Sequence, residues 1–241
     1  MPHPAPIGGL RGRAGVSALS PPEGFRTRGD PPTGTRLVLI RHGEAYCNAR
    51  GVVGGPLGCG GLTELGRAQA VALCERLTMS REFDDAVALY TSVLPRSIET
   101  ANIIAPGLPR QLVAVQDCEL CELHPGEADG MTWAQMVEAF GGPDWDDSPD
   151  TPFAPGGESW TGFYERCRRA LSAIAARHPG QRVILVVHGG VIEQAMKLVE
   201  GAEPSRRLGL RTENCSMTEI EFGGTRHRLL RYNDLAPLAA R

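Results

Sequence analysis

The sequence contains almost no lysine: Lys197 is the only one among 25 basic residues in a chain of 241. An arginine bias this strong is typical of a GC-rich genome, so residue type alone singles out no arginine. Acidic residues slightly outnumber basic ones, and the formal net charge is −3 at pH 7. This balance argues against nucleic acid or an anionic membrane as an obligatory partner, although it leaves room for a local basic pocket.

Long apolar runs are missing as well. No stretch approaches the ~20 apolar residues that a membrane-spanning helix needs, and the N-terminus lacks the apolar segment of a secretory signal. The seven cysteines are odd in number and scattered along the chain, which does not suggest a disulfide framework. We therefore expect a protein of a reducing, cytoplasmic compartment.

The sequence does contain enough apolar material for a substantial core, with 41% hydrophobic residues. Residues 1–34 are the exception, because they are rich in proline and glycine and offer little apolar surface to offset the entropy of ordering. We predict a disordered leader over residues 1–34 and a single domain over residues 35–241.

The first polar cluster follows an apolar run. Residues 37–40 read LVLI and lead directly into Arg41, His42 and Gly43. A short apolar run of this kind predicts a strand buried on both faces, as parallel strands are. The polar residues that follow should then lie at the carboxyl edge of the sheet, where open α/β folds keep their ligand crevices.

Two further runs repeat this layout. Residues 183–187, VILVV, lead into His188, and if both runs are parallel members of one sheet, His42 and His188 meet at the same edge. After a predicted strand over residues 86–90, Pro95 suits the first turn of a helix and places Arg96 near its N-terminus. The sequence therefore delivers three polar clusters to one edge.

The rest of the chain alternates strands with helices. Helices are predicted over residues 63–79, 132–140, 158–177 and 191–199, and further strands over residues 112–115, 215–222 and 227–232. This alternation predicts a three-layer α/β/α sandwich around a mostly parallel sheet, with an antiparallel strand near the C-terminus.

With these residues in place, the sequence resembles the histidine phosphatase superfamily, in its phosphoglycerate mutase-like branch. The resemblance covers about residues 36–232 and depends on five motifs in order. They are Arg41-His42-Gly43-Glu44 with Asn48, Leu62-Thr63-Glu64-Leu65-Gly66 with Gln69-Ala70, Ser92 and Arg96 with Thr100-Ala101, Leu120 and Glu122 with Gly126 and Gly130, and Gly156-Gly157-Glu158-Ser159 with His188-Gly189-Gly190.

The resemblance implies a hydrolase of the histidine acid phosphatase-like type, which cleaves a small phosphomonoester through a phosphohistidine. His42 would be the nucleophile, since a neutral imidazole is competent near pH 7. Arg41 and Arg96 would hold the phosphoryl group, because a guanidinium matches two phosphate oxygens at once. His188, protonated while substrate is bound, would add a third positive donor. Glu122 would protonate the leaving oxygen and must carry a proton to do so.

The supporting residues leave alternatives open. Asn48 and the backbone amides around Gly54, Gly55 and Gly189 are candidate phosphate donors, although the glycine-rich loop reads equally well as a flexible surface loop. Glu44, Glu119 and Glu127 are rivals to Glu122 because they lie close to it or within a motif. No metal or other cofactor is expected, since two arginines and two histidines supply the positive charge.

Two features depart from the family pattern. The chain has Cys59-Gly60-Gly61 where many relatives carry an aspartate before the Leu-Thr pair, so the shape of this loop is open. Cys47 stands where mutases tend to carry tryptophan.

Residues 131–157 are expected to form a lid. This segment contains no lysine or arginine and has five acidic residues, namely Glu138, Asp144, Asp146, Asp147 and Asp150. Because mutases are understood to seat a second acidic group with a strongly basic insertion here, an acidic lid favours hydrolysis, and it hints at a neutral or cationic leaving group. The alternatives are a phosphoglycerate mutase and a catalytically silent phosphate-binding or regulatory module.

Two other sets of residues are expected to have no functional role. Cys118, Cys121 and His124 suggest zinc, but a triad without a fourth ligand of suitable spacing predicts no metal site. The three tryptophans, Trp133, Trp145 and Trp160, are expected to pack in the core and lid rather than form a binding cage. The only partner expected is a small phosphomonoester.

Overall fold

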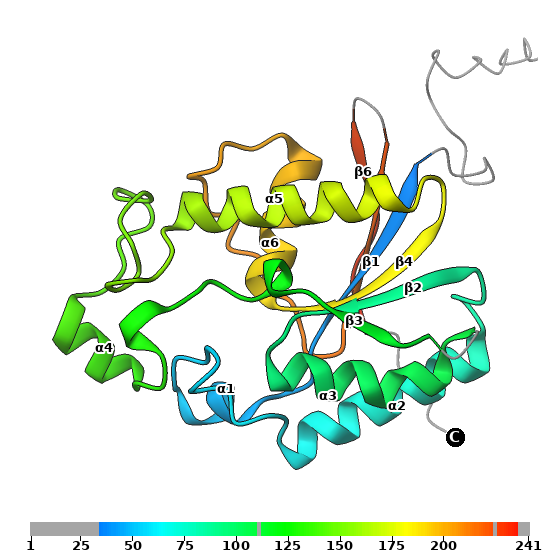
Figure 1. Ribbon diagram of the computed structural model, residues 1–241, viewed down its shortest axis with the longest axis horizontal. Coiled ribbons are helices and arrows are strands. Elements are labelled where there is room, and N and C mark those ends of the chain that lie inside the picture. The colour runs from blue at the N-terminus through cyan, green and yellow to red at the C-terminus, as the bar shows by residue number, and fades with distance from the viewer. Residues whose placement is uncertain (1–33, 110–111, 224–225, 236–241) are drawn as a thin grey trace, which may run out of the picture. The chain divides into compact units, whose positions relative to one another are not determined.

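The computed structural model describes residues 34–109, 112–223 and 226–235, all within one compact unit, Pro32–Arg241. Apart from Gly34, the predicted leader lies outside the described residues. One mixed sheet runs through the unit in the order β3-β2-β4-β1-β5-β6 (Figure 1). Its strands are β1 (Thr35–Arg41), β2 (Ala86–Thr91), β3 (Ala114–Gln116), β4 (Arg182–Val187), β5 (Met217–Phe222) and β6 (His227–Asp234).

Helices occupy the connections between these strands. They are α1 (Tyr46–Arg50), α2 (Glu64–Ser80), α3 (Pro95–Ile104), α4 (Trp133–Phe140), α5 (Trp160–Arg177) and α6 (Gly189–Glu200), with short 3-10 turns at Ala105–Gly107, Cys118–Leu120 and Gly126–Ala128. Within the described ranges, no helix combines the length and the apolar character that crossing a bilayer requires.

The pairing of the strands confirms the predicted mostly parallel sheet. β1, β4, β2 and β3 pair in parallel, whereas β5 is antiparallel to both β1 and β6. The carboxyl ends of β1, β2 and β4 therefore lie at the same edge, where open α/β sheets bind their ligands.

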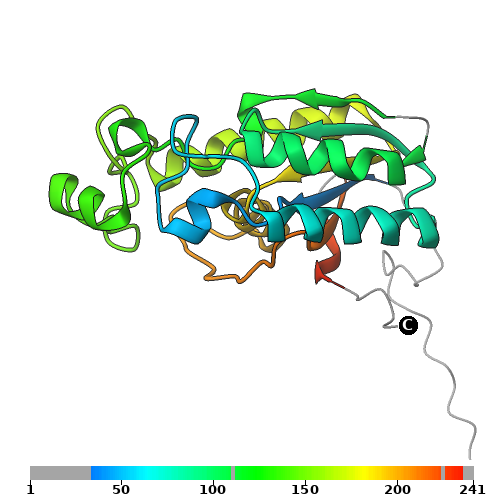
Figure 2. The ribbon, with the colours of Figure 1, turned by 90° about the horizontal axis from the view of Figure 1, so that it is seen from below.

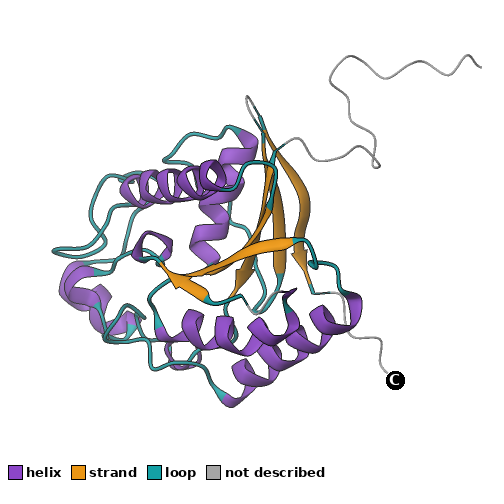
Figure 3. Ribbon diagram, turned by 45° about the vertical axis from the view of Figure 1, so that its right-hand side comes forward, coloured by secondary structure: helices purple, strands orange, loops and turns teal. Residues whose placement is uncertain are grey.

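The alternation of side chains along β1 assigns the helices to the two faces of the sheet. Leu37 and Leu39 pack with α5 and α6, whereas Val38 and Ile40 pack with α2 and α3, as the two-residue period of a strand requires. Figure 3 shows helices on both sides of the sheet, and Figure 2, seen from below, shows α2 and α3 side by side. The predicted three-layer α/β/α fold is confirmed.

Some boundaries differ from the predicted ones for local reasons. The helix expected from residue 158 begins at Trp160, because the Ser159 hydroxyl caps it by accepting the N–H of Gly162 at 3.1 Å. The strand expected from Cys215 begins at Met217, since Cys215 has a φ of 57°, a left-handed conformation that ends the extended chain. β3 starts two residues later than expected, and α1 has no counterpart among the predicted elements.

Candidate active site

The ends of β1, β4 and β2 bring the predicted polar residues together. Arg41 is in register with Val187, and Thr91 with Val186, so His42, His188 and Ser92 follow three adjacent strand ends. The two imidazole ring centroids lie 5.1 Å apart. The predicted meeting of His42 and His188 at one edge is confirmed.

The buried His42 ring is held in one tautomer. Its Nδ1 lies 2.7 Å from the carbonyl oxygen of Gly43, so Nδ1 carries the hydrogen and Nε2 keeps its lone pair. That Nε2 accepts a hydrogen bond from Arg96 Nε at 3.0 Å. Burial, followed by the positive charge of Arg96, holds the pKa of His42 well below its ordinary value of 6.5. The ring is therefore neutral near pH 7.

Arg96 is fixed in the first turn of α3, which begins at Pro95. Its side chain is buried, and Nη1 donates to the carbonyl oxygen of Gly54 at 2.7 Å. The hydroxyl of Thr100, one turn further on, donates to the Arg96 carbonyl and accepts the N–H of Gly43 at 3.1 Å. Arg96 and the backbone that follows β1 are thus tied into one unit.

His188 and Arg41 each present a buried donor without a partner. His188 Nε2 lies 2.8 Å from the Ser92 hydroxyl and 3.3 Å from the Ser97 hydroxyl, which leaves Nδ1 unpaired among the described residues. Arg41 Nε is likewise unpaired, although Nη1 donates to the carbonyl oxygen of Thr212. Burial and the nearby Arg96 lower the pKa of His188, so its ring is neutral near pH 7 in this state. Unpaired buried donors cost about 1–3 kcal/mol each, which an anionic acceptor would relieve.

Glu122 faces the same cavity as Arg41, His42 and Arg96. Its Oε2 accepts the N–H of Gly190 at 3.0 Å, at the start of α6. A Cβ on residue 190 would lie 2.2 Å from Glu122 Oε1, so only glycine permits this approach. The three rival carboxylates, Glu44, Glu119 and Glu127, do not line the cavity.

The glycine-rich loop differs from the expectation at one position. Asn48, Gly54 and Gly189 line the cavity, but the N–H of Gly55 donates to Asp129 Oδ1 at 2.8 Å and is not free for a phosphate. The Asp129 carboxylate also accepts the N–H groups of Leu57 and Gly58, at 2.8 and 2.9 Å. Asp129 is a residue that the sequence reasoning missed, and it supplies from outside the loop the carboxylate that the loop itself lacks.

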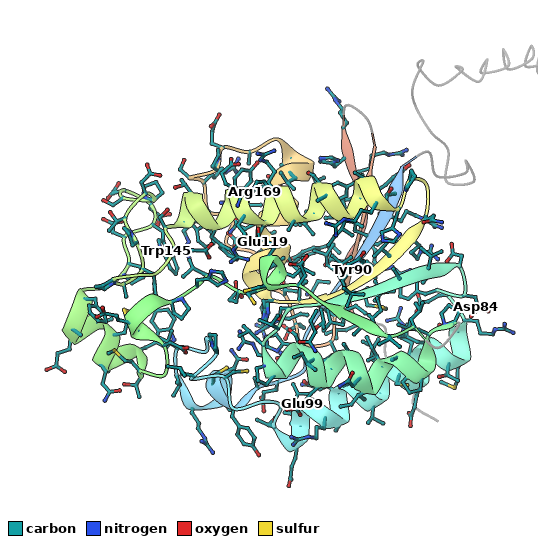
Figure 4. All side chains as sticks on the ribbon, in the orientation of Figure 1. Asp84, Tyr90, Glu99, Glu119, Trp145 and Arg169 are labelled. Atoms are coloured by element: carbon teal, nitrogen blue, oxygen red, sulfur yellow. The ribbon has the colours of Figure 1, made fainter. Side chains whose placement is uncertain are left out.

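Five aromatic side chains line the cavity, which has a volume of about 330 Å³. They are Trp133, Trp145, Phe153, Trp160 and Phe163. The Trp145 and Trp160 rings are stacked with centroids 5.2 Å apart, and Figure 4 shows Trp145 on the segment between α4 and α5. Trp160 is buried in the core and Trp145 packs against it, as expected, and all three tryptophans also line the cavity.

The acidic residues of the 131–157 segment are not part of the cavity lining, although Asp146 pairs with the lining residue Arg207 at 3.7 Å. All five are exposed, and none lines the cavity. The segment lines the cavity instead with Trp133, Trp145 and Phe153. The net charge of the segment therefore does not describe the side chains that a substrate would contact. The inference of a neutral or cationic leaving group, which depended on that charge, is no longer supported.

A second network missed by the sequence reasoning fixes the backbone around Glu122. Arg166, buried on α5, donates to both carboxylate oxygens of Glu158 at 2.7 Å. The same guanidinium donates to the carbonyl oxygens of Glu119, Cys121 and Glu122. Burial alone would raise the pKa of Glu158, but the hydrogen bonds from Arg166 and from a backbone N–H outweigh it and lower the pKa.

We expect Arg166→Met to lower the free energy of unfolding by about 3–5 kcal/mol, because it leaves a largely buried carboxylate and three carbonyl oxygens without their donor. Urea unfolding followed by circular dichroism measures the change. Arg168→Met on the same helix is the matched control, since Arg168 pairs with Glu165 at 2.9 Å on the surface and should contribute less than about 1 kcal/mol.

The pH dependence of this difference follows from the lowered pKa of Glu158. The pair contributes fully above the ordinary carboxyl pKa of about 4.5, and its contribution is lost as the pH falls and Glu158 becomes protonated. Equal stability of the Arg166 and Arg168 variants at pH 7 would show that the network is not structural.

Comparisons with known proteins agree with this geometry. The chain matches the family model of the histidine phosphatase superfamily (branch 1) over residues 37–235. It is 35% identical over 182 residues to the metal-independent phosphoserine phosphatase of Arabidopsis thaliana, with 72% of each chain covered. It is 32% identical over 210 residues to phosphoglycerate mutase-like protein 4 of the same plant, with 84% of this chain and 86% of the relative covered.

A solved structure shows the same fold. Mycobacterial glucosyl-3-phosphoglycerate phosphatase in complex with VO3 superposes with a TM-score of 0.69 at 29% sequence identity. The match covers 82% of this chain and 98% of that one.

Proposed function

The chain belongs to the histidine phosphatase superfamily, and from this membership and the site we propose that it hydrolyses small phosphomonoesters through a phosphohistidine on His42. The observation that carries the proposal is the neutral, buried imidazole of His42, whose Nε2 lone pair faces Arg96 at 3.0 Å. A nucleophile in contact with a guanidinium is positioned against the group that would hold a phosphoryl oxygen.

In the first step, His42 Nε2 attacks phosphorus and the bond from phosphorus to the leaving oxygen breaks. Arg96 and Arg41 hold the phosphoryl oxygens. As the N–P bond forms, the Arg96 Nε–H keeps its proton and donates its hydrogen bond to a phosphoryl oxygen instead of to His42 Nε2. Protonated Glu122 gives its proton to the leaving oxygen, which departs as an alcohol. The phosphoryl dianion favours protonation of His188, which then donates to it.

In the second step, a water molecule attacks the phosphohistidine. Glu122, now a carboxylate, takes a proton from the water, the N–P bond breaks, and its electron pair returns to His42 Nε2. Inorganic phosphate leaves and the starting state is restored. In both steps, side chains of this protein stabilise the charge on the phosphoryl group and transfer the protons. The proposal assigns no step to a metal ion.

Hydrolysis is proposed over phosphoryl transfer to a second substrate position. A mutase has to seat a second acidic group of its substrate in the same cavity. Among the described residues, the one cation that lines the cavity beyond Arg41 and Arg96 is Arg207, and it pairs with Asp146 at 3.7 Å. Apart from these three arginines, the lining is largely aromatic and carries the carboxylate of Glu193. A second acidic group of a substrate would therefore meet no further cation among the described lining residues, which supports hydrolysis.

We expect the purified chain to release phosphate from p-nitrophenyl phosphate, and to do so also in excess chelator. With 3-phosphoglycerate as the substrate, we expect it to release phosphate faster than it forms 2-phosphoglycerate. Phosphate release and isomer formation are measured on the same samples. Faster isomer formation would establish the mutase alternative. Binding of phosphate without any turnover would establish the silent binding module instead.

A further inference from the structure

A cluster of two thiols and one imidazole lies on the segment that carries Glu122. We propose that Cys118, Cys121 and His124 form a binding site for a borderline-soft divalent metal ion of the zinc class. The cluster does not line the catalytic cavity, and the proposal does not depend on the phosphoryl chemistry. The proposal differs from the prediction made from the sequence, which was that these three residues form no metal site because a fourth ligand of suitable spacing is missing.

The three ligand atoms already lie at the spacing that a metal needs. The Cys118 and Cys121 Sγ atoms are 3.8 Å apart, Cys118 Sγ is 3.9 Å from His124 Nε2, and all three atoms lie within 4.8 Å of one another. Ligands about 2.0–2.3 Å from a tetrahedral centre are roughly 3.5–3.8 Å apart. Binding therefore requires shifts of less than about 1 Å.

The imidazole is oriented for this role. His124 Nδ1 lies 3.7 Å from Glu158 Oε2, so the opposite nitrogen, Nε2, is the one presented to the thiols. The backbone N–H of His124 donates to the same carboxylate oxygen at 2.9 Å. At 3.7 Å this contact is longer than a hydrogen bond, and a small rotation of the ring would let the carboxylate accept the Nδ1–H, as carboxylates do behind ligating histidines in many zinc sites.

The backbone that carries the thiols is also fixed in place. Arg166 donates to the carbonyl oxygen of Cys121 at 2.9 Å and to that of Glu119 at 2.7 Å. Glu119 lies against α5, where Arg169 approaches it at 3.8 Å (Figure 4). A preorganised backbone lowers the ordering cost of metal binding.

The site is open to solvent on one side. Cys118 is exposed and His124 is half-buried, whereas Cys121 is buried. A metal can therefore enter, and water can take the fourth position of an otherwise three-ligand site. The expectation of no metal treated the missing fourth protein ligand as decisive, although water can fill that place.

The sequence around the site gives metal binding a structural consequence. Cys121 directly precedes Glu122, and His124 follows it by two residues. A metal held by both would link the two sides of the Glu122 segment. We therefore expect the bound ion to raise the thermal midpoint of unfolding of the whole chain.

The test uses the full, reduced chain and two metals. Cadmium titration followed by thiolate-to-metal charge-transfer absorption should give one ion per chain, and zinc calorimetry should give the same stoichiometry. Cys118→Ser and His124→Asn should each weaken binding at least about tenfold and abolish the zinc-induced rise in thermal midpoint. Cys74→Ser and His227→Asn, which change a cysteine and a histidine outside the cluster, are the matched controls and should bind as the wild type does.

Three results would overturn the proposal. The first is the lack of stoichiometric metal binding by the reduced wild type. The second is loss of binding in Cys118→Ser but not in His124→Asn, which excludes a three-ligand site. The third is binding that survives both variants and disappears in Cys47→Ser, which would place the ion in the catalytic cavity instead.

Discussion

Replacing His42 by alanine is expected to lower kcat/KM for p-nitrophenyl phosphate by about 10⁴- to 10⁶-fold, the size of effect that deletion of a nucleophile has elsewhere. Alanine removes the atom that bonds to phosphorus, and the remaining arginines can only bind the substrate. Cys47 lines the same cavity, but its hydrogen bond with Cys59 and its burial raise the pKa of its thiol, so it is protonated and a poor substitute.

The control for this prediction is His178→Asn. His178 follows α5 and contacts the Tyr90 hydroxyl through Nε2 at 3.0 Å, outside the cavity lining, so its replacement should leave kcat/KM within a few-fold of wild type. Circular dichroism and the urea midpoint establish that both variants fold. A folded His42→Ala variant that keeps more than a tenth of the activity would rule out a phosphohistidine on this residue.

The pH profile of the wild type gives a second readout of the same group. The ring must be neutral to attack, and its pKa lies well below 6.5 because of burial and Arg96. For p-nitrophenyl phosphate, whose leaving group does not need the proton of Glu122, kcat/KM corrected for ionisation of the substrate should therefore stay level as the pH falls through 6.5 and drop only at lower pH. A decline that begins above pH 6.5 would show that the ring is charged in the free protein.

The strand ends and the catalytic candidates that follow them could be predicted because their physics is local. A run such as residues 37–40 has no polar side chain to place on a solvated face, so it must be buried on both sides. Parallel pairing then fixes where the next residues lie, which is why His42 and His188 meet despite their separation in sequence.

Residues whose roles depend on the path of a loop could not be predicted. Asp129 holds the glycine loop through N–H groups more than 70 residues earlier in the sequence, and no periodicity connects the two segments. For the 131–157 segment, the composition gives the number of charged residues correctly but does not say which side chains line the cavity. Trp145 lines the cavity while its neighbours Asp144 and Asp146 are exposed, and an irregular segment has no period that would have revealed this.

Arg166 is different, because a signal for it was present. It lies three residues after Phe163 and four before Ala170, on the apolar stripe of α5. A charged residue on a buried helix face needs a partner, and Glu158 is one of the motif residues that could supply it. The abundance of arginine in this chain hid the position, since residue type was set aside as a compositional bias.

Glu122→Gln is expected to reduce activity by an amount that depends on the leaving group. Glutamine keeps the size of the side chain and an acceptor for the N–H of Gly190, but it cannot give a proton to the leaving oxygen. For an alkyl phosphate, whose alcohol leaves poorly without a proton, kcat/KM should fall by about 10²- to 10⁴-fold. Because kcat/KM reports the steps up to formation of the phosphohistidine, the second role of Glu122 as a base does not enter this comparison.

For p-nitrophenyl phosphate, the same variant should lose less than about tenfold in kcat/KM, because nitrophenolate leaves without protonation. Glu119→Gln is the matched control, since Glu119 is exposed, contacts Arg169 at 3.8 Å and does not line the cavity. A general acid predicts this divergence between the two substrates, whereas a residue that only positions Gly190 and the start of α6 affects both equally. Equal losses for the two substrates would therefore assign the proton to another group and leave Glu122 a structural role.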